Sequence, residues 1–221
     1  EIYTLSLHDA LPICTVAPAD GEPAPYISNT TALPIGWVGR DIGAVAKAGS
    51  NRFDPTTQRW TVAGSGADIW NTADEFRFVH TPVSGDVTIT ARVVSLGASD
   101  PWAKAGVMIR DGVAANARHA MTIASAARGM AFQRRAIVGG ASAHSAGSSA
   151  TPPRWVRLRR SGHTFRASES ADGSIWAAIG SGASIAMPTA ARAGLCVTSH
   201  RDGTLTTAIF EQVTVAPGAV N

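Results

Sequence analysis

Apolar and polar residues alternate along the stretch from Asp100 to Asp111, DPWAKAGVMIRD. This period of two is typical of a β-strand with one buried face. One side of the strand holds Ala103, Ala105, Val107 and Ile109, and the other holds Lys104, Gly106, Met108 and Arg110. The second side, with two cations and a thioether, is either a solvated sheet surface or the floor of a binding groove.

Similar short patterns recur along the chain and predict about a dozen strands, without any helical period longer than one turn. A tight turn is expected at residues 84–86, a turn or bulged loop between residues 42 and 59, and a long polar loop over residues 139–153. The predicted strands lie near residues 37–42, 59–64, 74–83, 86–96, 103–110, 117–125, 130–138, 154–162, 163–170, 174–180, 193–200 and 204–215. These strands predict an all-β, two-sheet sandwich whose connectivity the pattern does not give.

The domain organisation follows from changes in composition. Residues 1–13, EIYTLSLHDALPI, look like the in-frame translation of a sequencing adapter, and we exclude them from the fold. They lack the basic and continuous apolar regions of a signal peptide. Residues 14–35 are rich in Pro, Ala and Thr and read as a linker to another domain of the same polypeptide. Residues 36–216 form the predicted domain, and residues 217–221 a tail.

Charge and hydropathy limit the classes of binding partner that the chain is expected to have. The chain has 221 residues and a formal net charge of +3, which rises to +5 when Glu1 and Asp9 are excluded. The arginines are scattered, so nucleic acid is not indicated. No apolar run approaches the roughly 18 to 20 residues of a membrane span. A neutral or acidic polymer is the expected partner. Cys196, in the apolar run GLCVT, is expected in the core, and Cys14 lies at the adapter junction.

Several segments together carry a family resemblance. The succession GSGADIW, DEFRFV, SGDVTITARV, DPWAKAGVMIRD, AFQRR, RWVRLRRSGHTF, SESADGSIW and GLCVTSH is similar to the concanavalin A-like lectin/glucanase superfamily. The likeness covers residues 36–216 and is greatest to the branch of regulation-of-enolase-like domains appended to secreted bacterial proteins. It implies a jelly-roll sandwich with a convex and a concave sheet, an extracellular or cell-surface location, and binding to or display on polysaccharide.

The strand faces supply residues suited to a glycan groove. Sugar binding needs aromatic faces for stacking and planar polar groups that bond hydroxyls, which Trp, Arg and Gln provide. The predicted glycan-binding residues are Trp102, Lys104, Met108, Arg110, Gln133, Arg135, Trp155 and Arg157. Trp70, at a predicted loop end, would extend the groove. The alternative is that Trp155 is a core residue and that the basic residues cover a solvated sheet face.

Two other aromatic features are expected to be structural. Trp37 and Trp60 are expected to anchor the core because a buried indole removes a large area from water. The segment from Ser170 to Trp176, SADGSIW, is a hairpin-turn signature in which Asp172-Gly173 supplies the turn and Trp176 packs beneath it.

An enzymatic function finds less support in the sequence. The Glu-x-Asp-x-x-Glu strand of active glucanases in this superfamily is absent. A lyase site could use His119, His163 or His200 with Arg135 neutralising a uronate. However, the chain's two tyrosines lie outside the predicted domain, so the usual lyase base is missing.

No cofactor is predicted. No His/Cys cluster has zinc spacing. A structural calcium, common among jelly rolls, could use Asp41, Asp74 or Asp86.

Three hypotheses result. The preferred one is a non-catalytic carbohydrate-binding or surface-display module that binds glycan on the concave sheet. The others are a polysaccharide-degrading hydrolase or lyase with its site on that sheet, and a structural or adhesion spacer domain.

Overall fold

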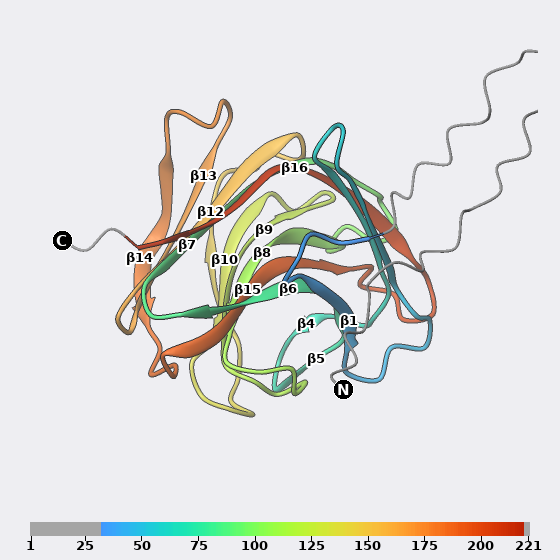
Figure 1. Ribbon diagram of the computed structural model, residues 1–221. Coiled ribbons are helices and arrows are strands. Elements are labelled where there is room, and N and C mark those ends of the chain that lie inside the picture. Colours follow the sequence, from blue (N-terminus) through green and yellow to red (C-terminus); the bar gives the residue numbers. More distant parts are fainter. Residues whose placement is uncertain (1–31, 219–221) are drawn as a thin grey trace, which may run out of the picture.

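The computed structural model describes residues 32–218 as two stacked antiparallel sheets of seven strands each, with a small third sheet beside them (Figure 1). The predicted all-β, two-sheet sandwich is confirmed. The predicted adapter segment 1–13, residues 14–31 of the predicted linker and residues 219–221 of the predicted tail lie outside the described residues. In the described part no helix is long and apolar enough to cross a membrane.

The first sheet, sheet A, contains the strand that the alternating pattern predicted. In spatial order it consists of β1 (Val38–Ile42), β6 (Phe76–Ser84), β15 (Ala190–Thr198), β8 (Lys104–Arg110), β9 (His119–Ser125), β10 (Met130–Arg135) and β11 (Ala143–Ala146). β8 lies at the centre of this order, with β15 on one side and β9 on the other.

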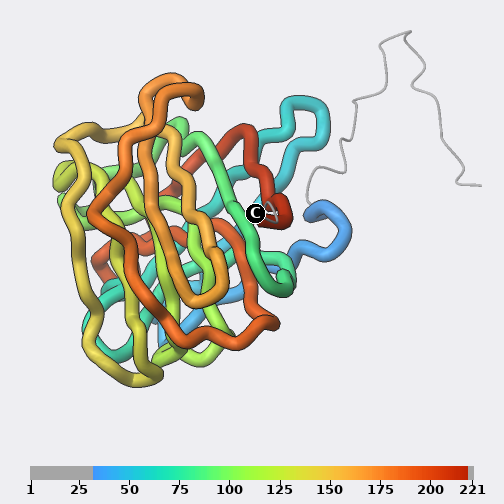
Figure 2. The backbone as a smooth tube through the Cα atoms, turned by 90° about the vertical axis from the view of Figure 1, so that its left-hand side faces the viewer, coloured from blue at the N-terminus to red at the C-terminus, as the bar shows by residue number. Residues whose placement is uncertain are grey.

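The second sheet, sheet B, covers one face of sheet A. In spatial order it consists of β14 (Ala177–Ser184), β13 (Thr164–Ser170), β12 (Arg154–Ser161), β7 (Val87–Leu96), β16 (Thr206–Pro217), β3 (Arg59–Gly64) and β2 (Ser50–Asp54). β12, β13 and β14 run side by side on one flank of the molecule (Figure 2). The third sheet is the hairpin β4 (Ile69–Trp70) and β5 (Ala73–Asp74).

The main core lies between the two sheets. Ala105, Val107 and Ile109 of β8 face it, as predicted, together with Val156 and Leu158 of β12. Trp60 is buried in this core and Trp37 packs against it, with ring centroids 4.8 Å apart, so both predicted anchors are confirmed. At about 25 cal/mol per Å² of apolar surface, indoles are among the larger contributions that single side chains make to such a core.

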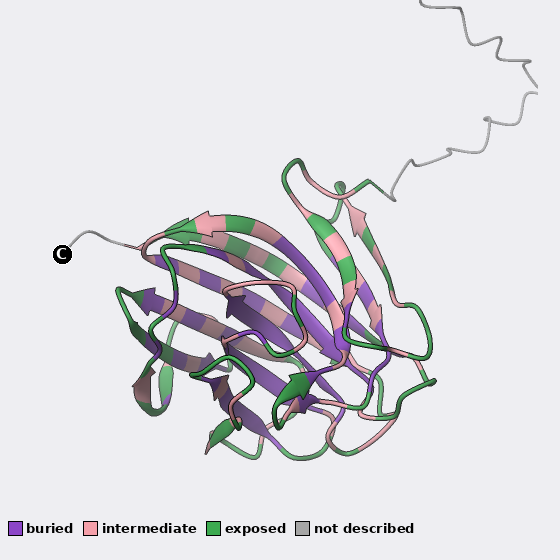
Figure 3. Cartoon of the chain, turned by 90° about the horizontal axis from the view of Figure 1, so that it is seen from below, coloured by how far each residue is buried: buried purple, intermediate pink, exposed green. Residues whose placement is uncertain are grey.

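The centre of sheet A is buried on both faces, which corrects the prediction of a half-buried central strand. Every residue of β8 and β9 is buried, whereas buried and more exposed residues alternate along β7 of sheet B (Figure 3). A second apolar cluster lies on the face of sheet A turned away from sheet B. It contains Ile42, Ile69, Phe76, Phe78, Met108, Met121, Ile123, Ala131 and Cys196. Ile69 of the β4–β5 hairpin belongs to this cluster, so a covering layer buries a face that alternation alone assigned to solvent or a groove.

Two predicted loops contain strands. The stretch between residues 42 and 59 includes β2, and the stretch 139–153 includes β11; both are edge strands with mostly polar or small residues. Edge strands bury little surface, and their hydrophobic pattern is therefore weak. The predicted tight turn at residues 84–86 is present, with Gly85 at φ 72°.

The turn signature between β13 and β14 forms as predicted. Ser170 Oγ accepts the backbone N–H groups of Asp172 and Gly173, and Asp172 Oδ1 accepts those of Ser174 and Ile175. The Trp176 Nε1–H donates to Gly173 O at 3.0 Å.

Candidate functional site

The β4–β5 hairpin is fastened to sheet A by one guanidinium group. Arg135 Nη2 donates to Trp70 O at 2.9 Å and to Asn71 O at 3.1 Å, and its Nε donates to Asn71 O at 3.2 Å. Asn71 turns the hairpin with φ 48°, a left-handed conformation that Asn tolerates better than most residues. Arg135 therefore positions the backbone that carries Trp70.

Asp74 holds that guanidinium and a second one. Arg135 binds it in a bidentate manner, at 2.6 Å to Oδ1 and 2.8 Å to Oδ2, and Arg110 Nη1 donates to Oδ2 at 3.0 Å. Arg110 also donates from Nε to Gly112 O and stacks its guanidinium over Phe76. All three charged side chains are fully buried.

The burial of this cluster bears on three roles considered from the sequence: glycan contact, calcium binding and a lyase base. Arg110 and Arg135, predicted to contact glycan, have no exposed surface, because the hairpin and the 112–117 loop cover them. Asp74, considered for calcium, has its carboxylate occupied by the two guanidiniums. His119, considered as a lyase base, lies against Asp74 at 3.5 Å, and burial lowers its pKa to about 3. The neutral imidazole is thus the stable form inside the cluster.

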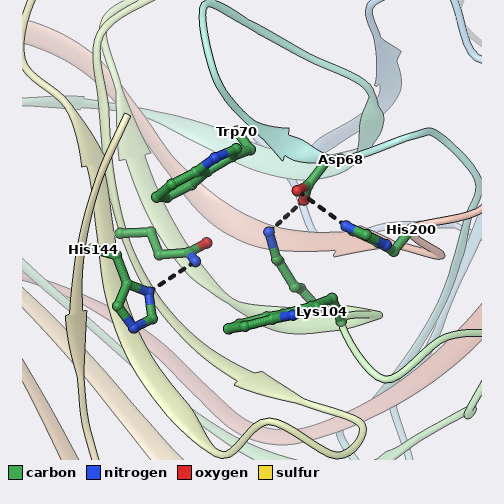
Figure 4. A pocket seen from close by; sticks show the side chains of 7 residues that line it. Asp68, Trp70, Lys104, His144 and His200 are labelled. Carbon is green, nitrogen blue, oxygen red and sulfur yellow. Dashed lines mark hydrogen bonds and ion pairs between the residues drawn. The ribbon is translucent and has the colours of Figure 1, made fainter. Parts of the chain in front are cut away.

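A pocket opens on the same face of sheet A, next to the hairpin. Its volume is about 460 Å³. Its lining residues come from the hairpin and the segment before it, from β8 and the loop before it, from β10 and β11, and from the loop after β15. They are Asp68, Trp70, Trp102, Lys104, Gln133, His144 and His200 (Figure 4). Three predicted binding residues, Trp102, Lys104 and Gln133, are brought together here, and Trp70 joins them as expected.

Two indoles flank one ammonium group in this pocket. Lys104 Nζ lies 5.8 Å from the Trp70 ring centroid and 5.7 Å from that of Trp102, within the range of cation–π attraction. The Lys104 side chain is 2% exposed, and burial lowers its pKa while Asp68 opposes that effect. Both indoles are partly exposed. The pocket therefore has aromatic walls with a charged group set deep between them.

Asp68 connects that ammonium to an imidazole. Lys104 Nζ donates to Asp68 Oδ1, and Asp68 Oδ2 lies 3.2 Å from His200 Nε2. The other ring nitrogen of His200 is 3.1 Å from Asp100 Oδ1. His200 has φ 56°, a left-handed conformation held by its surroundings. Asp68 thus bridges Lys104 and His200 (Figure 4), and Asp100 contacts the other ring nitrogen of the histidine.

The opposite wall is an amide–imidazole pair. Gln133 Nε2 and His144 Nδ1 are 3.1 Å apart, and the imidazole lies edge-on to both indoles, at 6.4 Å from Trp70 and 6.0 Å from Trp102. Burial, followed by Lys104 and Arg134, lowers the pKa of His144, which keeps the ring neutral at pH 7. Gln133 Oε1 is buried without a hydrogen-bond partner among the described residues. Such groups are normally satisfied by water or a ligand.

The remaining predicted binding residues lie elsewhere. Met108 is fully buried in the second apolar cluster. Trp155 and Arg157 are on β12 of sheet B, where Trp155 packs edge-on against Trp176 and Arg157 stacks over Trp176 at 3.6 Å. The prediction that all eight residues share one surface is wrong, because β10 and β12 belong to different sheets. Whether Trp155 and Arg157 contact a glycan stays a prediction.

The other carboxylates and the histidine that the sequence suggested for calcium binding or lyase chemistry lie outside the pocket. Asp41 pairs with Arg77 at 3.3 Å, and Asp86 accepts the backbone N–H of Gly162 at 2.6 Å. Within residues 32–218, no group of three or more His, Cys, Asp and Glu side chains is placed to hold a metal ion. His163 is exposed in the turn between β12 and β13.

Sequence reasoning missed Asp68 and His144 as pocket residues and considered His200 only as a lyase base. The sequence pointed to Asp68 in one way only: it lies in the GSGADIW segment, which carried part of the family resemblance. His144 lay in a stretch read as loop, and its place depends on β11 pairing with β10.

Comparisons with known proteins find similar folds among solved structures but no match by sequence. No known family matches the sequence, and no curated protein matches it significantly. Among solved structures, the chain is similar to a functionally unknown protein from Saccharomyces cerevisiae, at 16% identity and a TM-score of 0.61, over 82% of this chain and 95% of the other. It is also similar to the alginate lyase from Klebsiella pneumoniae, at 9% identity and a TM-score of 0.53, over 84% and 96%.

A third match is to part of a larger protein. The GH43 BlXynB protein from Bacillus licheniformis is 11% identical with a TM-score of 0.53, and the match covers 81% of this chain but 39% of that one. At these identities the likeness concerns the fold. This chain is therefore an antiparallel two-sheet β-sandwich, a fold that it shares with an alginate lyase and with part of a GH43 protein.

Proposed function

We propose that this domain binds a neutral carbohydrate in the pocket between Trp70 and Trp102, as a non-catalytic module. The observation that carries the proposal is the pair of partly exposed indoles on either side of a hollow with polar groups at its floor. Indole faces stack on the C–H groups of a sugar ring, and the polar floor bonds its hydroxyls.

The charge of the pocket favours a neutral sugar. Lys104 is paired with Asp68, so its positive charge is already balanced inside the protein. His144 is neutral because burial lowers its pKa. Hydroxyls can donate to Asp68 and to Gln133 Oε1, the buried acceptor without a partner in the described chain. A uronate would instead bring a second carboxylate next to Asp68, at an electrostatic cost.

The wider setting is part of the same proposal. The resemblance to regulation-of-enolase-like domains and the Pro-rich segment 14–35 support a module of an exported, multidomain protein that acts at the cell surface or outside the cell. The fold similarity to the alginate lyase and to the GH43 protein is compatible with carbohydrate as ligand, by analogy of fold.

Affinity electrophoresis in gels containing neutral polysaccharides tests the proposal. We expect Trp102→Ala to lose retention, with affinity about 30-fold weaker for a loss of roughly 2 kcal/mol, typical of a central aromatic contact. The matched control is Trp176→Ala, which removes a partly exposed indole from the connection between β13 and β14 of sheet B. Equal retention of the two folded variants, or equal loss in both, would count against the pocket.

A second candidate function is a carbohydrate-degrading enzyme, favoured by one specific observation. His200 lies 3.2 Å from Asp68 and 3.1 Å from Asp100 at the pocket edge, and a histidine between carboxylates is suited to proton transfer. Release of reducing ends or of unsaturated products from a bound polysaccharide, abolished in Asp100→Asn, would establish this function. Retention without product formation supports the binding module, and neither retention nor products would leave the spacer hypothesis.

A further inference from the structure

A second hollow lies on sheet B, over β12 and β13. These two neighbouring strands lie on one flank of the molecule (Figure 2). Its volume is about 250 Å³, and Arg159, Ser161, Thr164 and Arg166 line it. Arg159 is paired with Arg166, and Ser161 with Thr164, in the register of the two strands. Residues directly opposite each other share a face of the sheet. Because Leu158, the neighbour of Arg159, points into the core, these four side chains are on the outer face.

The two arginines are an electrostatic conflict. Like charges directly opposite each other on antiparallel strands are destabilising. Within residues 32–218 neither guanidinium has a carboxylate partner; Arg166 donates weakly to Ser181 O at 3.4 Å. The Asp86 carboxylate accepts hydrogen bonds from Gly162 N and Ser161 Oγ. The two arginines therefore repel each other without a carboxylate partner in the part of the chain that the structure describes.

We propose that this hollow binds an oxyanion group, a sulfate ester or a carboxylate, of an acidic polysaccharide. Two guanidinium forks approach from neighbouring strands, and the Thr164 hydroxyl adds a donor, which matches an oxyanion with several oxygens. The bound anion converts the repulsion into charge-assisted hydrogen bonds. A locally unfavourable pair on an otherwise regular sheet is the kind of inconsistency that a functional site explains.

A polymer fits better than a free ion. Arg157 lies two residues before Arg159 on β12, about 7 Å away along the strand and on the same face of the sheet. Like Arg159, it has no carboxylate partner among the described residues; its guanidinium stacks over Trp176. A chain with repeated anionic groups contacts both positions, whereas a single ion contacts one. The site is on the sheet opposite the aromatic pocket, so it stands or falls separately from the neutral-sugar proposal.

Salt elution from immobilised dextran sulfate and polygalacturonate tests the site. We compare wild type with Arg159→Thr/Arg166→Thr and with the control Arg40→Thr/Lys47→Thr, which removes two exposed cations from the β1 region. The expected result is at least tenfold weaker binding of the first variant to one or both columns, with the control close to wild type. Equal elution of the two variants, or retention of wild type on double-stranded DNA but on neither polysaccharide, would overturn the proposal.

A stability measurement separates loss of binding from loss of fold. In low-salt buffer without sulfate, Arg159→Thr should melt at the same temperature as wild type or higher, because it removes the cross-strand repulsion. Sodium sulfate, compared with sodium chloride at equal ionic strength, should raise the melting temperature of wild type more than that of the variant. Sulfate also stabilises proteins generally, so an equal rise in both proteins would contradict a specific site.

Discussion

Replacing Asp74 by Asn tests the buried cluster that supports the pocket. The carboxylate accepts three hydrogen bonds at 2.6 to 3.0 Å from Arg135 and Arg110, and all three side chains are fully buried. Asparagine removes the only negative charge in contact with these two guanidiniums in the described chain and places an amide where one oxygen was. Breaking a buried ion pair in this way costs about 3 to 5 kcal/mol, against a total stability of about 5 to 15 kcal/mol.

Urea denaturation followed by tryptophan fluorescence measures that cost. A loss of this size corresponds to a melting temperature lower by about 10 °C for a domain of this length. The double variant Asp74→Asn/Arg135→Met should be more stable than the sum of the single effects, with a coupling of at least about 1 kcal/mol, because it removes one of the uncompensated charges. A cost below about 1 kcal/mol for Asp74→Asn, or strict additivity, would refute this reasoning.

Two further predictions concern stability. Burial lowers the pKa of His80 to about 4 and of His119 to about 3, against 6.5 for the unfolded chain, so the unfolded state binds more protons below pH 6.5. The free energy of unfolding should be fully present above pH 6.5 and fall as the pH drops towards 4; a urea midpoint unchanged from pH 7.5 to 4.5 would contradict this. Gly173→Ala should cost about 2 to 3 kcal/mol, because φ is 79° and the new Cβ would lie 2.7 Å from the Trp155 ring. Gly85→Ala, at φ 72° with open space around it, should cost about 1 kcal/mol, and equal melting temperatures of the two variants would be inconsistent with the close contact.

The fold was largely predictable because its core strands carry strong local patterns. Alternation placed the core-facing side of β8 and of β12 correctly, and turn chemistry placed the β6–β7 and β13–β14 turns. The edge strands β2 and β11 were missed because few of their residues are buried, so burial leaves little imprint on their sequence.

The site was predictable only in part. The sequence indicated that Lys104 and Gln133 share the non-core side of their strands, and the structure places them in one pocket. It could not show that Arg110 and Arg135 are covered, because the covering hairpin is two residues per strand and has no recognisable period. Nor could it show that Trp155 is on the other sheet, since strand order follows from long-range pairing.

The most direct test of the account is the indole N–H region of a ¹H–¹⁵N NMR spectrum, in which the six tryptophans of the chain give separate signals. On titration with oligosaccharides from a neutral polysaccharide that retains the protein, the signals of Trp70 and Trp102 should shift in parallel and saturate at one equivalent, while those of Trp155 and Trp176 stay in place. Shifts confined to Trp155 and Trp176 would contradict the proposed pocket, as would binding that leaves all six signals unchanged.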